Sequence, residues 1–400
     1  MKKESRNLIL IFIVVLIDLI GFGIIIPILP RYSETHFSAN EFQIGVLIAS
    51  FSFFQFISTP VLGKLSDHYG RKPIITFSLL LSTISYLIFA FAPNYFVALF
   101  SRSIAGIGGG SISAAQAYIA DVTEKQERAK GMGLIGTAFG LGFVLGPIIG
   151  GSLSIYGYII PNISAALFSF IALILTLNFL EESLINKKAS KINTNELFES
   201  FKMTRYINTF SSPIVGKFIL IFFIITFSIA NTYGITPIFA YKRLDLTDSQ
   251  IGSIYGIIGI VGVIFQGYLI GKLVRKYGER NLMTFGMIFM ALGLFLVPFS
   301  NTFKSMIFFY MIIAMGLSLI NPTSLSLISK YSPSDRQGQI LGVNQSMGSL
   351  GRVLGPIWGG ISFKSFGFLA PFLTASFFTL MALIIGIINF TKLNKKEKDF

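Results

Sequence analysis

The stretch GKLSDHYGRKPIITF, at residues 63–77, decides the fold because it occurs twice in the chain. Residues 271–285 read GKLVRKYGERNLMTF, and they begin 208 residues later. A second stretch, GFVLGPIIGG at 142–151, recurs 209 residues later as GRVLGPIWGG at 351–360. Because the two offsets are nearly equal, one internal duplication explains both pairs, and the sequence predicts two repeats of similar length.

The chain around these repeats is strongly apolar. Of its 400 residues, 53% are hydrophobic and 12% charged, whereas soluble domains contain roughly 25% charged residues. Apolar runs of about 20 residues can cross a bilayer, and these are too long for barrel strands, so we expect transmembrane α-helices. The predicted fold class is an all-α integral membrane protein with twelve spans. The spans are predicted at 7–29, 43–62, 74–92, 95–118, 131–154, 160–180, 218–239, 250–271, 282–300, 303–327, 339–361 and 368–390.

The basic residues predict the orientation of the chain in the membrane. With the N-terminus inside, the inside segments contain 25 Lys and Arg residues and the outside loops five. The positive-inside rule then places both termini in the cytoplasm. Lys2, Lys3 and Arg6 precede an apolar run as in a signal peptide, but Asp18 interrupts the run and no small-residue cleavage site follows. We expect an uncleaved first helix and a multi-pass protein of the cell membrane.

The longest polar interval, 181–217, divides the spans six and six. We predict an N-terminal half at 1–180, a cytoplasmic linker at 181–217 and a C-terminal half at 218–400 that ends in a short basic tail. Since six is even, both repeats enter the membrane in the same orientation and are parallel repeats about the membrane normal. This arrangement is typical of transporters, and it places a binding site near the midplane between the halves.

Several classes of chemistry are excluded by composition. The chain has no Cys and only two His, which argues against thiolate or imidazole metal sites, and we expect no cofactor. Each Gly-Lys pair lacks the following Ser or Thr of a Walker A loop, so ATP is not expected to drive the protein. The spans hold no paired carboxylates or nucleophile–base set, so we expect no enzyme. The net charge of +14 lies in short loops and does not indicate a nucleic-acid partner.

The first repeated stretch contains a predicted ion pair. Asp67 and Arg71 are four residues apart, so a helical turn brings their charges together. Arg275 and Glu279 hold the same positions in the second copy with exchanged signs. Together with the repeated glycines Gly63 and Gly70, the pair favours a structured latch between helices; the alternative is a solvated turn.

The second repeated stretch predicts close helix packing. Gly142, Gly146 and Gly150 recur every four residues and share one helix face with room for another helix, beside Gly151. Pro147 removes a backbone hydrogen bond and can bend the span. Packing alone is a sufficient reading of this pattern.

Four signatures together resemble the major facilitator superfamily. Residues 63–73 are similar to its loop signature, and 142–151 to the fifth-helix motif of its drug/proton antiporters. Arg102-Ser-Ile-Ala-Gly106 resembles the fourth-helix motif, and residues 21–30 after Asp18 resemble the first helix of twelve-span tetracycline and multidrug pumps. The resemblance covers the whole chain and implies proton-coupled export by alternating access, with residues 142–151 sealing the halves against leak.

Asp18 is the acidic residue that lies well inside a predicted span, near the bilayer centre. A carboxylate there should pair with a cation or take up a proton. Arg102 reaches a similar depth from the opposite side, and helices one and four adjoin in the resembled fold. The pair is therefore predicted to couple transport to protons; the alternative is a fixed ion pair.

Arg352 is a cation inside a span of the second half, which has no intramembrane acid to neutralise it. It could reach the interface, contact helix-end carbonyls, share Asp18 or meet a substrate anion. Other polar residues that could face a cavity in this half are Asn231, Gln266, Asn321, Asn344 and Gln345.

The sequence thus predicts a monomeric secondary transporter that exports a small amphipathic drug or metabolite in exchange for protons. The alternative is a proton symporter or uniporter for a sugar or another metabolite. Tetracycline itself is doubtful, because Ser85 stands where the resembled tetracycline pumps carry an acid in helix three. The expected partners are the small-molecule substrate, protons and the lipid bilayer.

Overall fold

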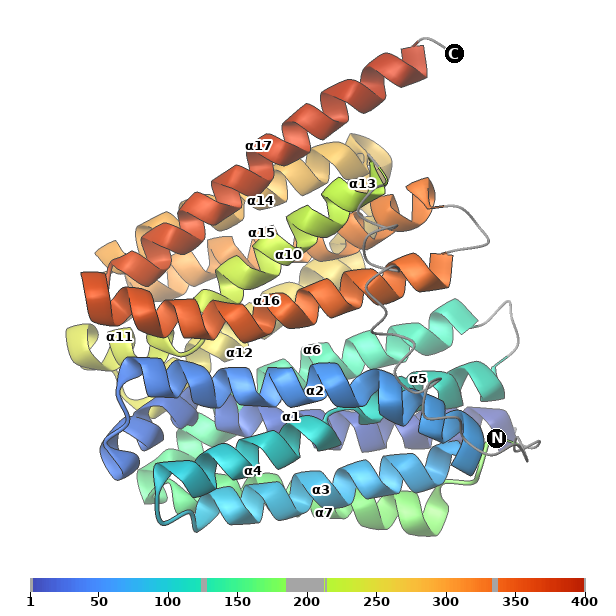
Figure 1. Cartoon of the computed structure of the whole chain (residues 1–400), viewed down its shortest axis with the longest axis vertical. Coiled ribbons are helices and arrows are strands. Elements are labelled where there is room, and N and C mark those ends of the chain that lie inside the picture. Colours follow the sequence, from blue (N-terminus) through green and yellow to red (C-terminus); the bar gives the residue numbers. More distant parts are fainter. Residues whose placement is uncertain (1–2, 124–127, 185–211, 213, 333–336, 399–400) are drawn as a thin grey trace. The chain divides into compact units, whose positions relative to one another are not determined.

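The computed structural model of the chain describes residues 3–123, 128–184, 212, 214–332 and 337–398. Every element among these residues is helical (Figure 1), which confirms the predicted all-α fold. Most of the predicted linker, 181–217, lies outside the described residues. Its role as the boundary between two halves therefore stays a prediction.

The helices of the first half follow the six predicted spans. They are α1 (Lys3–Phe37), α2 (Glu41–Tyr69), α3 (Arg71–Ala90), α4 (Tyr95–Gly108), α5 (Ser111–Val122), α6 (Arg128–Leu153) and α7 (Ile159–Phe179), with a short 3-10 turn after α6.

One predicted span, 95–118, is divided into α4 and α5. The chain breaks at Gly109 and Gly110, where a Cβ on either residue would lie within 3 Å of a side chain of α2. Gln55 of α2 donates from Nε2 to the Gly109 carbonyl oxygen at 3.1 Å. The side chain thereby satisfies a backbone group that the break exposes, as a buried helix end requires.

The helices of the second half also follow the predicted spans. They are α10 (Val215–Thr232), α11 (Ile235–Leu244), α12 (Asp248–Ile264), α13 (Ile270–Tyr277), α14 (Glu279–Leu296), α15 (Phe303–Tyr331), α16 (Gln337–Phe366) and α17 (Ala370–Lys398). A π-helical turn, Phe265–Leu269, joins α12 to α13.

Nine helical stretches of the described chain are long and apolar enough to cross a membrane. The three other predicted spans are helical as well. Two of them are interrupted, by the glycine break between α4 and α5 and by the π turn after α12. The third, α16, is less apolar because it includes Asn344, Gln345 and Arg352. Polar residues and irregular backbone within spans are typical of functional positions in membrane proteins.

The helices pack into two compact units. The first contains Met1–Asn40, Ser50–Ser200 and Thr247–Gly256, and the second Glu41–Ala49, Phe201–Leu246 and Ile257–Phe400. Each unit therefore includes a short segment from the other half of the sequence.

Neighbouring helices in each unit are far apart in sequence. In the first unit, α1 packs against α6 and α7, and α3 against α4 and α7. A buried hydrophobic cluster forms a core of this unit. It includes Ile11 of α1, Leu79 of α3 and Tyr118 of α5, together with residues of α6 and α7. In the second unit, α10 packs against α16 and α17, and α14 against α15 and α17.

Candidate functional site

Asp18 of α1 is partly buried and is held by a residue of α7. The Ser169 hydroxyl donates to Asp18 Oδ1 at 2.9 Å. Gly21, one turn further along α1, permits this contact, because a Cβ there would lie 3.1 Å from the backbone oxygen of Ala165. The small residue lets α7 approach closely enough for its serine to reach the carboxylate.

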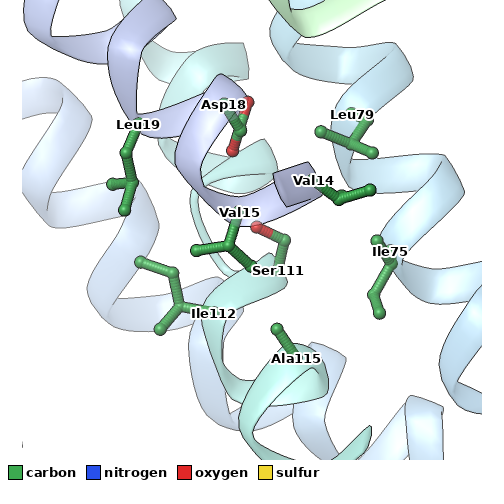
Figure 2. A pocket seen from close by; sticks show the side chains of 9 residues that line it. All are labelled: Val14, Val15, Asp18, Leu19, Ile75, Leu79, Ser111, Ile112 and Ala115. Atoms are coloured by element: carbon green, nitrogen blue, oxygen red, sulfur yellow. The ribbon is translucent and has the colours of Figure 1, made fainter. Parts of the chain in front are cut away.

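A small cavity borders Asp18 within the first unit (Figure 2). Its volume is about 10 Å³, close to what one water molecule occupies. Asp18 of α1 and Ser111 of α5 supply its polar groups. The remaining lining is apolar and comes from Val14, Val15, Leu19, Ile75, Leu79, Ile112 and Ala115. A carboxylate facing such a cavity can exchange a proton with a single water molecule.

Arg102 of α4 is 5% exposed and does not form an ion pair with Asp18 in the described chain. Its guanidinium lies over the Phe51 ring, 4.8 Å from the ring centre, and its Nε has no hydrogen-bond partner among the described residues. Tyr86 of α3 interacts electrostatically with both charged residues. The direct pair considered from the sequence is therefore absent, because Ser169 and Phe51 are the close partners and Tyr86 lies near both charges.

The predicted ion pair at the end of α2 is present. Arg71 Nη1 lies 2.5 Å from Asp67 Oδ1 and also donates to Ser66 Oγ at 2.7 Å. Arg71 Nε donates to Asp121 Oδ2 of α5 at 3.0 Å. Burial alone would lower the pKa of Arg71, but its bonds to Asp121 and Asp67 outweigh burial and raise that pKa above the usual value. The guanidinium stays charged and joins α2, α3 and α5.

Glu182, just after α7, is a partner of this cluster that the sequence did not reveal. Its Oε1 accepts the backbone N–H of Arg71 at 2.9 Å and so caps the N-terminus of α3. Gly70 has a φ of 111°, and a Cβ there would lie 2.1 Å from Glu182 Oε2. Gly63 faces Ser113 of α5, whose Oγ would be 3.4 Å from an added Cβ. The two consecutive acids directly after the α7 span, Glu181 and Glu182, are the signal that could have found this partner.

The second copy of this stretch is arranged differently. Glu279 accepts a hydrogen bond from Ser326 of α15, and no ion pair joins it to Arg275 within the described residues. The pair with exchanged signs is therefore not formed, because α14 packs on α15 and directs Glu279 to that helix. Gly278 keeps the positive φ of Gly70, at 76°.

The glycines of the fifth-helix motif make the close approach that their spacing predicts. An added Cβ would lie 2.7 Å from Leu19 at Gly142, 2.6 Å from Gly23 at Gly146 and 2.1 Å from Ile24 at Gly150. The backbones of α6 and α1 are therefore nearly in contact.

Two further residues belong to the same motif of α6. Pro147 lies within α6, and an added Cβ at Gly151 would be 2.4 Å from the backbone oxygen of Asp248 in α12.

The copy in α16 packs in the same way against α10. Cβ atoms added at Gly351, Gly355 and Gly359 would lie 3.0, 2.8 and 2.2 Å from atoms of α10. At Gly360, the counterpart of Gly151, an added Cβ would lie 2.5 Å from the backbone oxygen of Glu41. The duplication seen in the sequence thus recurs as duplicated helix contacts.

Asp248, at the start of α12, binds two residues of the first unit that the sequence did not connect with it. Arg31 Nη1 donates to its Oδ1 and the Tyr158 hydroxyl to its Oδ2, both at 3.1 Å. Asp248 is 6% exposed. The sequence places Arg31 in a loop, whereas the extended α1 includes it and aligns it with α12.

The polar candidates of the second half divide into buried and exposed residues. Asn231 is buried and donates to the Pro371 backbone oxygen at 2.9 Å, so it joins α10 to α17. Asn344 is also buried, without a side-chain partner among the described residues. Gln266, Asn321 and Gln345 are exposed, and Arg352 is partly exposed. Arg352 donates from Nη2 to Ser349 Oγ at 2.9 Å.

Comparisons with known proteins agree with this architecture. The sequence matches the family described as the Major Facilitator Superfamily over residues 11–281 and again over 218–400. It is 30% identical to multidrug resistance protein 2 of Bacillus subtilis, over 100% of this chain and 98% of that protein. It is 31% identical to the class C tetracycline resistance protein of Escherichia coli, over 89% of each chain.

Solved structures share the fold at lower identity. A variant of the nucleoside transporter NupG matches 96% of this chain and 100% of its own with a TM-score of 0.79, at 13% identity. The family match and the two relatives, together with the duplicated helices and motifs, assign the function class as well as the fold. The chain belongs to the Major Facilitator Superfamily, and it is a membrane transporter rather than an enzyme.

Proposed function

We propose that this transporter exports a small amphipathic drug or metabolite in exchange for protons. The relatives named for multidrug and tetracycline resistance support the export of such compounds. The observation that carries proton exchange is the setting of Asp18: a carboxylate in the middle of α1, bordering a water-sized cavity and bonded to a neutral serine. Because no cation of the described residues pairs with it directly, its charge can change with its access to water.

The proton cycle follows from this setting. An ionised carboxylate within a membrane is costly unless it is hydrogen-bonded and hydrated, so closing its access to water favours the protonated form. When Asp18 gives up its proton, the Ser169 hydroxyl stabilises the carboxylate through its hydrogen bond. Substrate binding and protonation of Asp18 then favour different conformations of the transporter. A single carboxylate can in this way couple the movement of substrate to that of protons.

The cluster around Arg71 is proposed as the latch of the conformational cycle. It joins the ends of α2, α5 and α7 to the start of α3 through three carboxylates, from Asp67, Asp121 and Glu182. Contacts of this kind can be made or released as helix ends shift. The packed glycines of 142–151 are proposed to keep α1 and α6 sealed against leak during the same movement.

The setting in the cell is proposed from the sequence. The distribution of 25 inside and five outside basic residues supports a protein of the cell membrane with both termini in the cytoplasm. We propose that the protein transports its substrate as a monomer, because one chain already contains both of the repeats that a transporter of this kind requires.

The test compares Asp18→Asn with Asp245→Asn in inside-out vesicles under an imposed pH gradient. Asp245 is exposed, and its φ of 51° suits asparagine, so the control removes a carboxyl without strain. Asp18→Asn should abolish uphill uptake of a fluorescent amphipathic dye and leave downhill exchange measurable, whereas Asp245→Asn should behave as the wild type.

Two results would contradict the proposal. Undiminished proton-driven accumulation by folded Asp18→Asn protein would make Asp18 a structural residue. Movement of protons in the same direction as the substrate would show symport in place of exchange.

A further inference from the structure

A polar stripe runs along the middle of α16, which is a helix of the second unit. Gln345, Ser349 and Arg352 follow at intervals of four and three residues, so they lie on one helix face. Gln345 is exposed, and Ser349 and Arg352 are partly exposed. These three residues are called the α16 stripe below.

The α16 stripe does not face lipid. The exposed leucines of the same helix, Leu350 and Leu354, are each two residues from Arg352 and therefore lie about 200° around the axis from it. Their side chains are 36% and 40% exposed and suit contact with hydrocarbon. Polar side chains exposed at membrane depth are typical of residues that face water-filled cavities, so aqueous surroundings are expected for the stripe.

Arg352 cannot reach the membrane surface. Fifteen residues separate it from Gln337, the first residue of α16, and fourteen from Phe366, the last. At 1.5 Å per residue both helix ends are about 20 Å away, which excludes their carbonyls as partners, and the nearer end of the predicted span 339–361 is nine residues or about 14 Å away. The guanidinium therefore remains at membrane depth.

The groups around Arg352 are neutral. Its Nη2 donates to Ser349, and Tyr233 at the end of α10 interacts with it electrostatically. The acids with described side chains in this unit, Glu41, Asp245 and Glu279, lie at or just beyond helix ends. Arg352 thus has a cationic charge in the membrane that none of the carboxylates described in its unit neutralises.

We propose that the α16 stripe binds an anionic group, a carboxylate or similar oxyanion, on the transported compound. The inference rests on the proposed export function and defines its substrate class. A guanidinium offers five N–H donors in a planar fork that matches a carboxylate, and Ser349 occupies only one of its terminal nitrogens. The exposed amide of Gln345 adds a donor two turns away along the same face.

Gly348 brings an aromatic side chain of α10 close to the guanidinium. A Cβ at Gly348 would lie 3.6 Å from Arg352 Nη1 and 2.7 Å from the Phe222 ring of α10. The glycine therefore lets the guanidinium lie close to an aromatic side chain. Phe222 is 9% exposed, so it forms an apolar wall behind the guanidinium.

The experiment measures binding to the full-length protein in lipid nanodiscs, with empty nanodiscs as the blank. The probes are pyrenebutyrate and its methyl ester, which differ in the negative charge. The wild type should bind the acid more tightly than the ester. Arg352→Gln should weaken binding of the acid by about 10- to 100-fold and that of the ester by less than about twofold, as expected for a charged hydrogen bond.

Three further variants keep the result specific. Arg352→Lys retains the charge and should restore part of the preference for the acid. Lys364→Gln removes an exposed positive charge near the end of the same helix and should change neither probe. Asp18→Asn should keep the preference for the acid, so loss of proton coupling and loss of anion binding are separate outcomes. Equal affinity of the wild type for the two probes, or equal weakening of both by Arg352→Gln in folded protein, would overturn the proposal.

Discussion

Asp67 and Asp121 share one guanidinium, but they differ in exposure. The Asp67 side chain is 54% exposed and that of Asp121 is 24% exposed, while Arg71 is 7% exposed. Exposed ion pairs contribute up to about 1 kcal/mol, so the contribution of Asp67 is small and Asp121 keeps Arg71 paired without it. If the cluster acts as the proposed latch, Asp67 is therefore the carboxylate that can be released first.

Asp67→Asn should slow turnover by about two- to fivefold while substrate binding persists, because the residue affects the conformational equilibrium and lies away from Asp18. Initial transport rates and equilibrium binding, measured on the same purified protein, check this. A parallel loss of binding would remove Asp67 from the latch.

At this scale the sequence predicts contacts between residues that are close in sequence and misses those between distant segments. Asp67 and Arg71 are four residues apart, and their pair was predictable. Asp121 and Glu182 lie 50 and 111 residues from Arg71, and only the packing of α5 and α7 brings them to it. For the same reason Ser169, 151 residues from Asp18, could not be identified as its partner.

Helix packing between α1 and α6 depends on which glycines meet a neighbour. Gly146→Ala would place a Cβ 2.6 Å from the Gly23 Cα, a backbone atom that cannot move aside. We expect a loss of on the order of 2–3 kcal/mol in stability and a lower melting temperature.

The matched control is Gly136→Ala in the same helix, where an added Cβ would meet nothing within 4 Å. Its stability should be unchanged or higher, since alanine favours helix by about 1 kcal/mol over glycine. Thermal unfolding of both variants in the same lipid or detergent decides the matter. Equal melting temperatures would show that α1 and α6 do not require this contact.

For whole elements, periodicity and length predicted helix type and approximate bounds. They did not predict the division of 95–118 into α4 and α5, because glycines within a span are compatible with both a packed helix and a break. The Gln55 side chain that satisfies the break comes from another helix, so tertiary contact decides between the two.

At the scale of the whole molecule, the orientation in the membrane remains a prediction from charge. Asn394→Cys introduces the first thiol into a chain without Cys. It should react with an impermeant maleimide in inside-out vesicles and not in intact cells. Labelling from outside intact cells would overturn the twelve-span topology.

Each packed unit includes a short segment from the other half of the sequence. This limits which chimeras of related transporters can fold. A chimera with its crossover in the linker would take α6 from one parent and Thr247–Gly256 from the other. A Cβ at Gly252 would lie 2.3 Å from the backbone oxygen of Pro147, so an alanine inherited there would collide with α6. The segment Glu41–Ala49 is constrained by α16 in the same way, since a Cβ added at Gly45 would lie 2.2 Å from the backbone oxygen of Pro356. Viable hybrids should be those whose parents both carry glycine at these crossings, or which exchange both segments together with the helices they touch.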